Sequence, residues 1–320
     1  MRVGVLRGGK SSEYEVSLRT GQTVLKHLPE PYQAKDILID KSGVWHLDGL
    51  PISPAQAARQ VDVFWNAMHG EFGEDGQVQR LLEELAMPYT GSESAASALG
   101  MNKEAAKQIF RQAGFKVPPG MVVEAASGFD PIETAKLIFQ KISPPWVVKP
   151  VDRGSSVGLA FARTVGELAQ ALADASAYSD ALLVEHYLRG REATCGVVEG
   201  LRGQSTYALP PIEIRKPGAN SVWTYEDKYS GATEEICPAT FPEAEKKLLE
   251  ELSVKAHEAL GLRHYSRSDF IITPHGIYLL ETNSLPGLTT ESLLPKALAA
   301  IGTSYPDFLD HVIKLAVGKR

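Results

Sequence analysis

The sequence has little cysteine and no long hydrophobic run. Its 320 residues include two cysteines, Cys195 and Cys237, which are too few for a disulfide framework and lack the C-x-x-C spacing of zinc or redox sites. No segment approaches the roughly 20 apolar residues that a membrane span requires, and the N-terminus has no long apolar stretch typical of a secretion signal. We therefore expect reduced cysteines, no membrane association and a cytoplasmic protein.

The sequence also lacks an excess of positive charge. Thirty-three Lys and Arg against 39 Asp and Glu give a net charge of −6, which disfavours nucleic acid or an anionic membrane as the partner. Any anionic ligand must then be held by local groups. With 43% hydrophobic and 22% charged residues, the composition is that of an ordinary globular protein. The length suggests two or three domains that fold without a metal or disulfide.

The first ninety residues alternate between strand-like and helix-like segments. Strands are expected at 3–6, 34–39 and 61–69, and helices at 15–28 and 77–85. This alternation predicts a parallel sheet covered on both faces. Such sheets bind ligands at the carboxyl ends of their strands, here the loops 9–13 and 69–76. The pair Gly8-Gly9 is not a G-x-G-x-x-G motif, so a dinucleotide cofactor is disfavoured.

The pattern changes in the middle of the chain. A helix at 101–113 is followed by strands at 146–150 and 181–185, a glycine and serine loop at 152–158 and a helix at 165–175. These segments predict a small, separate α+β domain. The remaining expected elements are a strand at 192–198, a long polar loop at 216–235, a helix at 242–260 and a hairpin at 266–283.

The expected hairpin brings two carboxylates together. A three-residue loop at 274–276, with proline first and glycine last, pairs Thr273 with Ile277. Continued along the strands, this register sets Asp269 opposite Glu281, and the period of two keeps Arg267 and Asn283 on the same face.

Two facing carboxylates repel one another unless a cation lies between them. Asp, Glu and Asn offer only oxygen ligands, which suits Mg²⁺ or Mn²⁺, and Mg²⁺ is usually shared between protein groups and phosphate oxygens. The alternative is an exposed polar face on an edge hairpin, because a register slip of one residue would destroy the pairing.

Further segments are typical of phosphate binding. Lys149 ends an apolar strand, and the loop from Gly154 to Gly158 offers backbone N–H groups and the hydroxyls of Ser155 and Ser156. It is not a Walker motif, because the lysine precedes the glycines. Glu185 ends another apolar strand, where a carboxylate can serve an adenine edge or ribose. The alternatives are a flexible turn for the loop and a capping or salt-bridging role for Glu185.

Taken in order, the motifs resemble the ATP-grasp ligases, and among them the D-alanine–D-alanine ligase family. They are GGKSSEYEVSL at 8–18, HGEFGEDG at 69–76, VKP at 148–150 with GSSVG at 154–158, DKY at 227–229, and ETNSLPG at 281–287 leading into SLLP at 292–295. The resemblance covers nearly the whole chain. It implies an α/β ATP-grasp fold, with an N-terminal parallel α/β domain at 1–98, followed by two α+β domains, central at 99–188 and catalytic at 189–320, which clamp ATP.

The resemblance also implies a reaction. One D-alanine attacks the γ-phosphate of ATP, and a second D-alanine attacks the resulting acyl phosphate to give a dipeptide for peptidoglycan, with ADP and phosphate released. A D-alanine–D-lactate depsipeptide ligase and a non-catalytic ATP-binding homologue are the alternatives. Tyr229 favours the dipeptide, since lactate-using members tend to lack a tyrosine there. The family also suggests a homodimer.

Residue roles follow from the same resemblance. Two Mg²⁺ or Mn²⁺ ions are expected on Asp269, Glu281 and Asn283, with Arg267 stabilising the developing charge. The residues expected at ATP are Lys103, Lys149, Ser155, Ser156, Glu185, Leu188, Glu192 and Lys228. Glu13 and His69 are expected at the first D-alanine, the backbone N–H of Gly287 in the oxyanion hole, and Ser292 and Leu293 at the carboxylate of the second D-alanine. Ser155 and Tyr229 are expected to tie the loop at 216–235 over the site together with Glu13, closing it when ATP binds.

Overall fold

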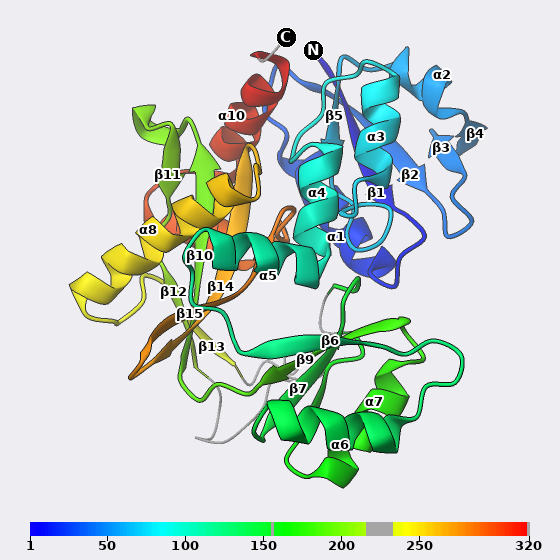
Figure 1. The fold of residues 1–320 in the computed structure, drawn as a ribbon. Coiled ribbons are helices and arrows are strands. Elements are labelled where there is room, and N and C mark those ends of the chain that lie inside the picture. The colour runs from blue at the N-terminus through cyan, green and yellow to red at the C-terminus, as the bar shows by residue number, and fades with distance from the viewer. Residues whose placement is uncertain (155–156, 216–232, 319–320) are drawn as a thin grey trace.

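The computed structural model describes residues 1–154, 157–215 and 233–318, and within these ranges the strands form three sheets (Figure 1). The first sheet occupies the N-terminal part, the second the middle of the chain and the third the C-terminal part. Figure 1 shows the second sheet and its helices below the other two. In the same ranges, no helix is both long enough and apolar enough to cross a bilayer.

The first sheet is parallel at its centre, as predicted. Its order is β4-β3-β2-β1-β5, and β1 pairs in parallel with both β2 and β5. Its strands are β1 (Arg2–Gly8), β2 (Gln33–Ile39), β3 (Trp45–Leu47), β4 (Leu50–Ile52) and β5 (Val63–Asn66), and its helices are α1 (Tyr14–His27), α2 (Pro54–Ala58) and α3 (Gln77–Glu84). The expectation of a purely parallel sheet is wrong at one edge, where β3 and β4 are antiparallel. The connection from β2 to β3 is too short for the crossover that a parallel strand needs.

The glycine turn after β1 is held by a buried serine. Gly8 has φ +89°, and a Cβ there would lie 2.2 Å from the carbonyl oxygen of Ile39. The hydroxyl of Ser17 accepts a hydrogen bond from the N–H of Gly8 (2.8 Å) and donates one to the carbonyl of Ala67 (2.9 Å). These bonds fix the carboxyl ends of β1 and β5 beside the start of α1.

The second sheet is antiparallel and has helices on one face. Its order is β6-β9-β7-β8. The strands are β6 (Gly120–Glu124), β7 (Trp146–Pro150), β8 (Ala160–Ala162) and β9 (Ala181–His186), and the helices are α6 (Pro131–Lys141) and α7 (Val165–Ala175). Trp146, Leu172 and Val184 belong to one buried cluster. This packing agrees with the small α+β unit expected from the sequence.

The helix expected at 101–113 is α5 (Lys103–Gln112), and a further helix, α4 (Ser94–Met101), precedes it without having been predicted. α4 ends at Asn102, whose ψ of 102° breaks the helix and whose side chain accepts from the N–H of Ala105, thereby starting α5. Phe110 of α5 packs in the same cluster as Phe270 of the third sheet. α5 is thus anchored on the third sheet, although it precedes the second one in sequence.

The third sheet has the order β13-β12-β10-β14-β15, with β11 paired to β10. Its strands are β10 (Arg191–Glu199), β11 (Thr206–Ala208), β12 (Ile212–Arg215), β13 (Glu234–Ile236), β14 (Tyr265–Thr273) and β15 (Gly276–Asn283), and the accompanying helices are η1 (Leu201–Gly203), α8 (Glu243–Ala259), α9 (Leu293–Ala300) and α10 (Tyr305–Gly318). Of the polar loop expected at 216–235, residues 216–232 lie outside the described ranges, and the last two belong to β13.

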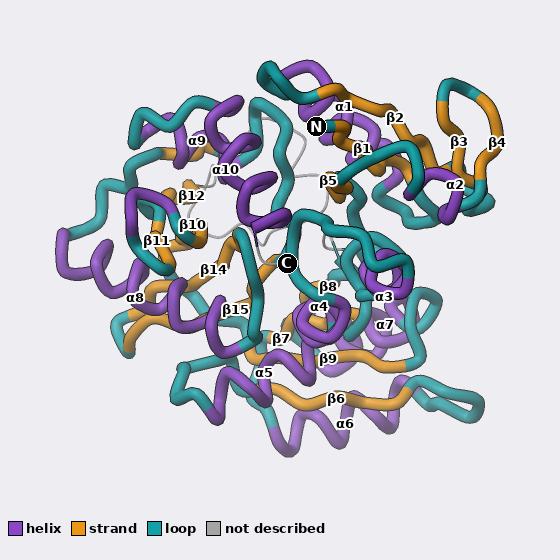
Figure 2. The backbone as a smooth tube through the Cα atoms, turned by 90° about the horizontal axis from the view of Figure 1, so that it is seen from above, coloured by secondary structure: helices purple, strands orange, loops and turns teal. Residues whose placement is uncertain are grey.

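Aromatic packing joins the first and third sheets. The ring of Trp65 on β5 stacks on Tyr265 of β14, with centroids 6.5 Å apart, and meets Phe308 of α10 edge to face at 6.3 Å. All three side chains are fully buried. Figure 2 shows α10 between β5 and β10. The two sheets therefore share one core, and the edges that carry the predicted site residues face each other.

The hairpin of β14 and β15 has the predicted pairing for a reason that the sequence did not reveal. Thr273 pairs with Gly276 rather than Ile277, so the expected three-residue loop is wrong by one residue. A β-bulge then leaves Leu280 without a cross-strand partner and restores the register, so that Asp269 faces Glu281 and Arg267 faces Asn283.

Candidate active site

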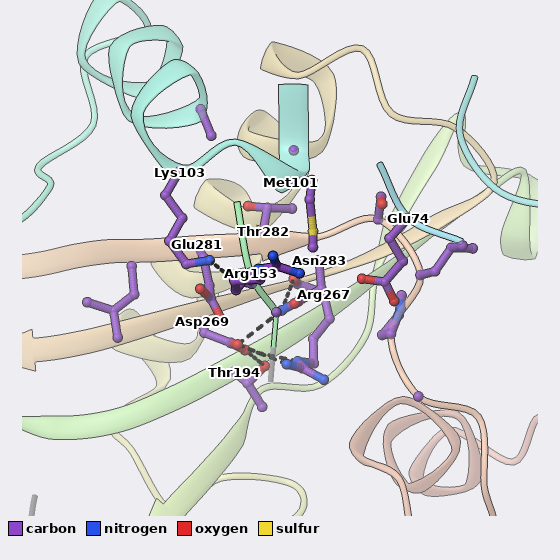
Figure 3. A pocket seen from close by; sticks show the side chains of 18 of the residues that line it. Glu74, Met101, Lys103, Arg153, Thr194, Arg267, Asp269, Glu281, Thr282 and Asn283 are labelled. Carbon is purple, nitrogen blue, oxygen red and sulfur yellow. Dashed lines mark hydrogen bonds and ion pairs between the residues drawn. The ribbon is translucent and has the colours of Figure 1, made fainter. Parts of the chain in front are cut away.

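A cavity of about 350 Å³ lies where the three sheets and α5 meet (Figure 3). The structure brings most of the predicted site residues to its wall. Those that line it are Glu13, His69, Lys103, Lys149, Glu192, Arg267, Asp269, Glu281, Asn283, Gly287 and Leu293. Residues far apart in the sequence thus converge on one volume.

Asp269 is the centre of a hydrogen-bonded group on the third sheet. Arg267 donates from Nε and Nη2 to its two carboxylate oxygens, each at 2.9 Å. Thr194, directly opposite on β10, donates to Oδ1 at 2.6 Å, and the amide of Asn283 donates to Oδ2 at 3.1 Å. Burial lowers the pKa of Arg267, but the charge and hydrogen bonds of Asp269 outweigh it and raise that pKa. The guanidinium therefore stays charged.

The donor set on this edge fits a hard cation. Asp269 and Glu281 face each other, and Asn283 adds an amide oxygen, so every donor available to a metal is oxygen. Among the described residues, no group of three His, Cys, Asp or Glu side chains is arranged to hold a metal. The trio here has two carboxylates and one amide, which suits Mg²⁺ or Mn²⁺ completed by phosphate oxygens rather than an all-protein site.

Lys103 and Lys149 also line the cavity, and the part that they form is called the lysine wall below. Lys103 donates from Nζ to the carbonyl of Arg153 and, in Figure 3, reaches toward Glu281. Burial lowers the pKa of Lys103, and the charge of Glu281 offsets this lowering only in part. Lys149 lies 2.9 Å from Oε2 of Glu185. Burial lowers the pKa of Lys149 too, but the charges of Glu185 and Glu281 outweigh it and raise that pKa. Lys149 therefore keeps its positive charge close to the carboxylates of Glu185 and Glu281.

Of the predicted residues that the structure describes, three do not line the cavity. Glu185 is buried beside Lys149, and Leu188 follows β9. Ser292 precedes α9, where its hydroxyl accepts from the N–H of Thr289 at 3.1 Å. A Cβ at Gly287 would lie 3.0 Å from this hydroxyl, so the backbone at Gly287 passes close to Ser292.

The carboxyl end of the first sheet supplies a buried histidine. His69 is 5% exposed; its Nε2 lies 2.9 Å from the hydroxyl of Thr20 and its Nδ1 2.9 Å from Oε1 of Glu74. Burial lowers the pKa of His69, but the hydrogen bond to Glu74 and the charges of Glu74 and Glu13 outweigh it and raise that pKa. Burial raises the pKa of Glu74. The two groups therefore hold a proton between them at one end of the cavity.

The sequence reasoning gave no role to several residues at this site. Glu74 lies within the quoted motif at 69–76, and Thr194 lies two residues after Glu192 on the same strand, so period-two counting could have found it. Arg153 forms an ion pair with Glu71, linking the glycine and serine loop to the loop after β5. Its partner could not be predicted, since the two loops meet only in the folded chain. Ser155, Ser156, Lys228 and Tyr229 lie outside the described residues.

Two family models and a sequence relative match this chain over most of its length. The family model described as D-ala D-ala ligase N-terminus matches residues 2–51 and 48–92, and that described as D-ala D-ala ligase C-terminus matches residues 109–314. A D-alanine–D-alanine ligase of Pelotomaculum thermopropionicum is 38% identical over 321 residues, spanning 99% of this chain and 97% of that protein.

Solved structures give the same result. The D-alanine–D-alanine ligase from Coxiella burnetii has a TM-score of 0.85 at 27% identity, covering 100% of this chain and 94% of that one. The Bacillus anthracis enzyme complexed with ATP has a TM-score of 0.79 at 28% identity, covering 100% and 98%. The similarity therefore extends over all three sheets.

Proposed function

Because the chain belongs to the D-alanine–D-alanine ligase family, we propose that it joins two D-alanines with conversion of ATP to ADP and phosphate, supplying a dipeptide for peptidoglycan. The predicted family and ATP-grasp fold are confirmed by these matches and by the solved relatives. The carboxylate of the first D-alanine attacks the γ-phosphate, and the amine of the second attacks the acyl phosphate that results.

The observation that carries this proposal is the convergence of cations and carboxylates on one cavity. Lys103, Lys149 and Arg267 line it together with Asp269 and Glu281. Phosphoryl transfer needs fixed positive groups around the phosphate oxygens, and the tetrahedral intermediate of acyl transfer needs donors at its oxyanion. Lys103, Lys149 and Arg267 offer such groups.

The carboxylate edge would hold the metal ions that accompany ATP. We assign two Mg²⁺ or Mn²⁺ ions to Asp269, Glu281 and Asn283, in keeping with their oxygen donors. Such ions neutralise phosphate charge when bound. Arg267 lies beside this edge, so its guanidinium would stabilise the charge that develops on the acyl phosphate.

The two amino acids would bind next to each other in the cavity, because the amine of the second must reach the activated carboxyl carbon of the first. Glu13 and His69 would hold the first D-alanine, with the Glu13 carboxylate paired to its ammonium. The backbone N–H of Gly287 would donate to the oxyanion, while Ser292 and Leu293 would hold the carboxylate of the second D-alanine. Since the Ser292 hydroxyl already binds the Thr289 N–H, it would act by hydrogen bonding and not as a nucleophile.

ATP would lie along the lysine wall. Lys103 and Lys149 would bind phosphates and Glu192 the ribose, while Glu185 and Leu188 are proposed near the adenine. The predictions for Ser155, Ser156 and Lys228 as ATP ligands, and for Tyr229 as the residue that closes the loop with Glu13 and Ser155, remain proposals. A loop closed at 216–235 would protect the acyl phosphate from water.

The deciding experiment measures ADP and phosphate release by the purified protein with Mg·ATP, alone, with D-alanine, and with D-alanine plus D-lactate. D-Alanine-dependent release with dipeptide formed is expected. Release that rises only with D-lactate would indicate the depsipeptide ligase. ATP binding without release under any condition would indicate the non-catalytic homologue.

The assembly and location of the protein are further proposals. We propose a homodimer in the cytoplasm, with domain boundaries at 1–98, 99–188 and 189–320. Sedimentation of the full chain tests the dimer, and limited proteolysis with mapped cleavage sites tests the boundaries. A monomer at micromolar concentration would contradict the proposed dimer. Cleavage confined to segments away from these boundaries would contradict the proposed domain division.

A further inference from the structure

Two lysines that line the cavity, Lys107 and Lys149, both bind one buried glutamate, Glu185. Lys107 follows Lys103 by one helical turn on α5, so both face the same side. Its Nζ lies 2.7 Å from Oε1 of Glu185, and both side chains are 2% exposed. Lys149 lies 2.9 Å from Oε2. Two ammonium groups therefore bind the two oxygens of one buried carboxylate.

Lys107 also reaches the third sheet. Its Nζ donates to the carbonyl of Leu280 at 3.0 Å. Leu280 is the residue that the β14–β15 register skips, and the bulge leaves its carbonyl available to a side chain. The next residue is Glu281, on the carboxylate edge. A single ammonium therefore connects α5, the middle strands β7 and β9 through Glu185, and the strand that carries Glu281.

The charges of this group support one another. Burial alone raises the pKa of Glu185, but the charges of Lys107 and Lys149 outweigh it and lower that pKa. Burial lowers the pKa of Lys107, and the charge of Glu185 offsets this lowering in part. If Lys107 lost its charge, Glu185 would have Lys149 as its remaining cation and would draw this ammonium away from the cavity.

We propose that Lys107 is a positioning residue for ATP, which holds Glu185 so that Lys149 presents its ammonium to the phosphates at a fixed distance from Glu281. Since Lys107 is bound to Glu185 and Leu280, it acts through them. The inference rests on the proposed function in so far as the nucleotide is ATP.

The test compares Lys107→Gln with the wild type. The glutamine amide can still donate to the Leu280 carbonyl but carries no charge. We expect the dissociation constant of Mg·ATP, measured by calorimetry, and the KM for ATP to rise about tenfold or more. The KM for D-alanine should stay within about twofold, because the first-substrate groups are untouched. Lys107→Arg keeps the charge and should restore ATP affinity to within about threefold.

Lys136→Gln is the matched control. Lys136 forms an exposed ion pair with Glu133 on α6, outside the cavity lining. The same substitution there removes one lysine charge without touching the cavity. Its ATP affinity and both KM values should equal those of the wild type. The proposal would be overturned if a folded Lys107→Gln variant kept the ATP affinity of the wild type or raised the KM for ATP and the KM for D-alanine equally. It would also be overturned if Lys107→Arg bound ATP as weakly as Lys107→Gln.

A second variant covers the case in which Lys107→Gln does not fold. Lys107→Met combined with Glu185→Met replaces the buried ion pair by apolar side chains, a change that folded proteins often tolerate. Because Glu185 is itself proposed near the adenine, the reference is Glu185→Met alone. Since Lys107 acts through Glu185, the double variant should bind Mg·ATP as Glu185→Met does, to within about twofold, and a further loss of affinity in the double variant would overturn the proposal. A wild type that binds ATP without D-alanine-dependent ADP release would contradict the proposed function only, because the comparison of ATP affinities remains valid.

Discussion

Arg267 binds both oxygens of the Asp269 carboxylate through two parallel N–H···O bonds of 2.9 Å. The two residues lie two positions apart on β14, so their side chains leave the same face of the sheet. This geometry holds the guanidinium in one orientation before any substrate arrives. It also sets a fixed positive charge directly beside the carboxylate edge.

Removal of the Arg267 guanidinium should slow turnover. We expect Arg267→Ala to lower kcat by about 100-fold or more, with a smaller effect on the KM for ATP, because its charge acts on the transition state. Arg267→Lys should remain impaired, since an ammonium cannot form both bonds. Steady-state kinetics of D-alanine-dependent phosphate release measures both kcat and KM.

Arg191→Ala, which removes an ion pair with Glu245, is the control. An unchanged kcat in Arg267→Ala would exclude a role of Arg267 in the transition state.

Neutralising either facing carboxylate should abolish the metal site and leave the fold. We expect Asp269→Asn and Glu281→Gln to lose at least about 100-fold in turnover at saturating Mg²⁺. The melting temperature of Glu281→Gln should stay near that of the wild type, because removing one of two facing negative charges relieves repulsion. That of Asp269→Asn should fall by a few degrees, because Arg267 loses its charged partner. Glu245→Gln, a change of the same kind at a half-buried position outside the cavity lining, is the control. Full activity of either variant at the Mg²⁺ concentration used for the wild type would contradict the assignment.

The pair of His69 and Glu74 should make stability depend on pH. The folded pKa of His69 is raised above its ordinary value of 6.5, so its contribution is present below about pH 6.5 and is lost as pH rises through the folded pKa. Glu74→Gln should therefore cost about 2 kcal/mol of unfolding free energy at pH 6 and less at pH 9. Urea unfolding at the two pH values measures the difference.

Glu71→Gln provides the control for that experiment, since Glu71 lies in the same loop but pairs with Arg153. Its loss of unfolding free energy should be no larger at pH 6 than at pH 9. The Glu74 prediction is wrong if the cost of Glu74→Gln is the same at both values, or if an NMR titration of the variant leaves the pKa of His69 unchanged.

The turn after β1 should not accept a side chain. In Gly8→Ala the new Cβ would meet the Ile39 carbonyl oxygen at a positive φ, so we expect a loss of about 3 kcal/mol or more. Gly128→Ala has a similar φ of +91° but no atom within 4 Å of the new Cβ, and should cost only about 1 kcal/mol. Thermal unfolding compares the two, and equal costs would show that the contact with Ile39 is unimportant.

The sequence by itself determined the parallel centre of the first sheet and which residues of β14 and β15 share a face. Alternation of strand and helix patterns gave the parallel centre of the first sheet, because apolar periodicity reports which face of an element is buried. The period of two on β14 and β15 placed Arg267 with Asp269 and Glu281 with Asn283, because alternate residues of a strand share a face. Oxygen-only donors gave the expected class of metal for the same local reason.

The tertiary structure decided what joins these parts. Whether β3 and β4 run antiparallel, where Asn102 divides two helices and how a bulge at Leu280 corrects the hairpin register depend on packing between distant segments. Lys107 looks in the sequence like any helical lysine. Only the folded chain brings it to Glu185 and Leu280, because local patterns carry no information about which distant carboxylate a buried ammonium will meet.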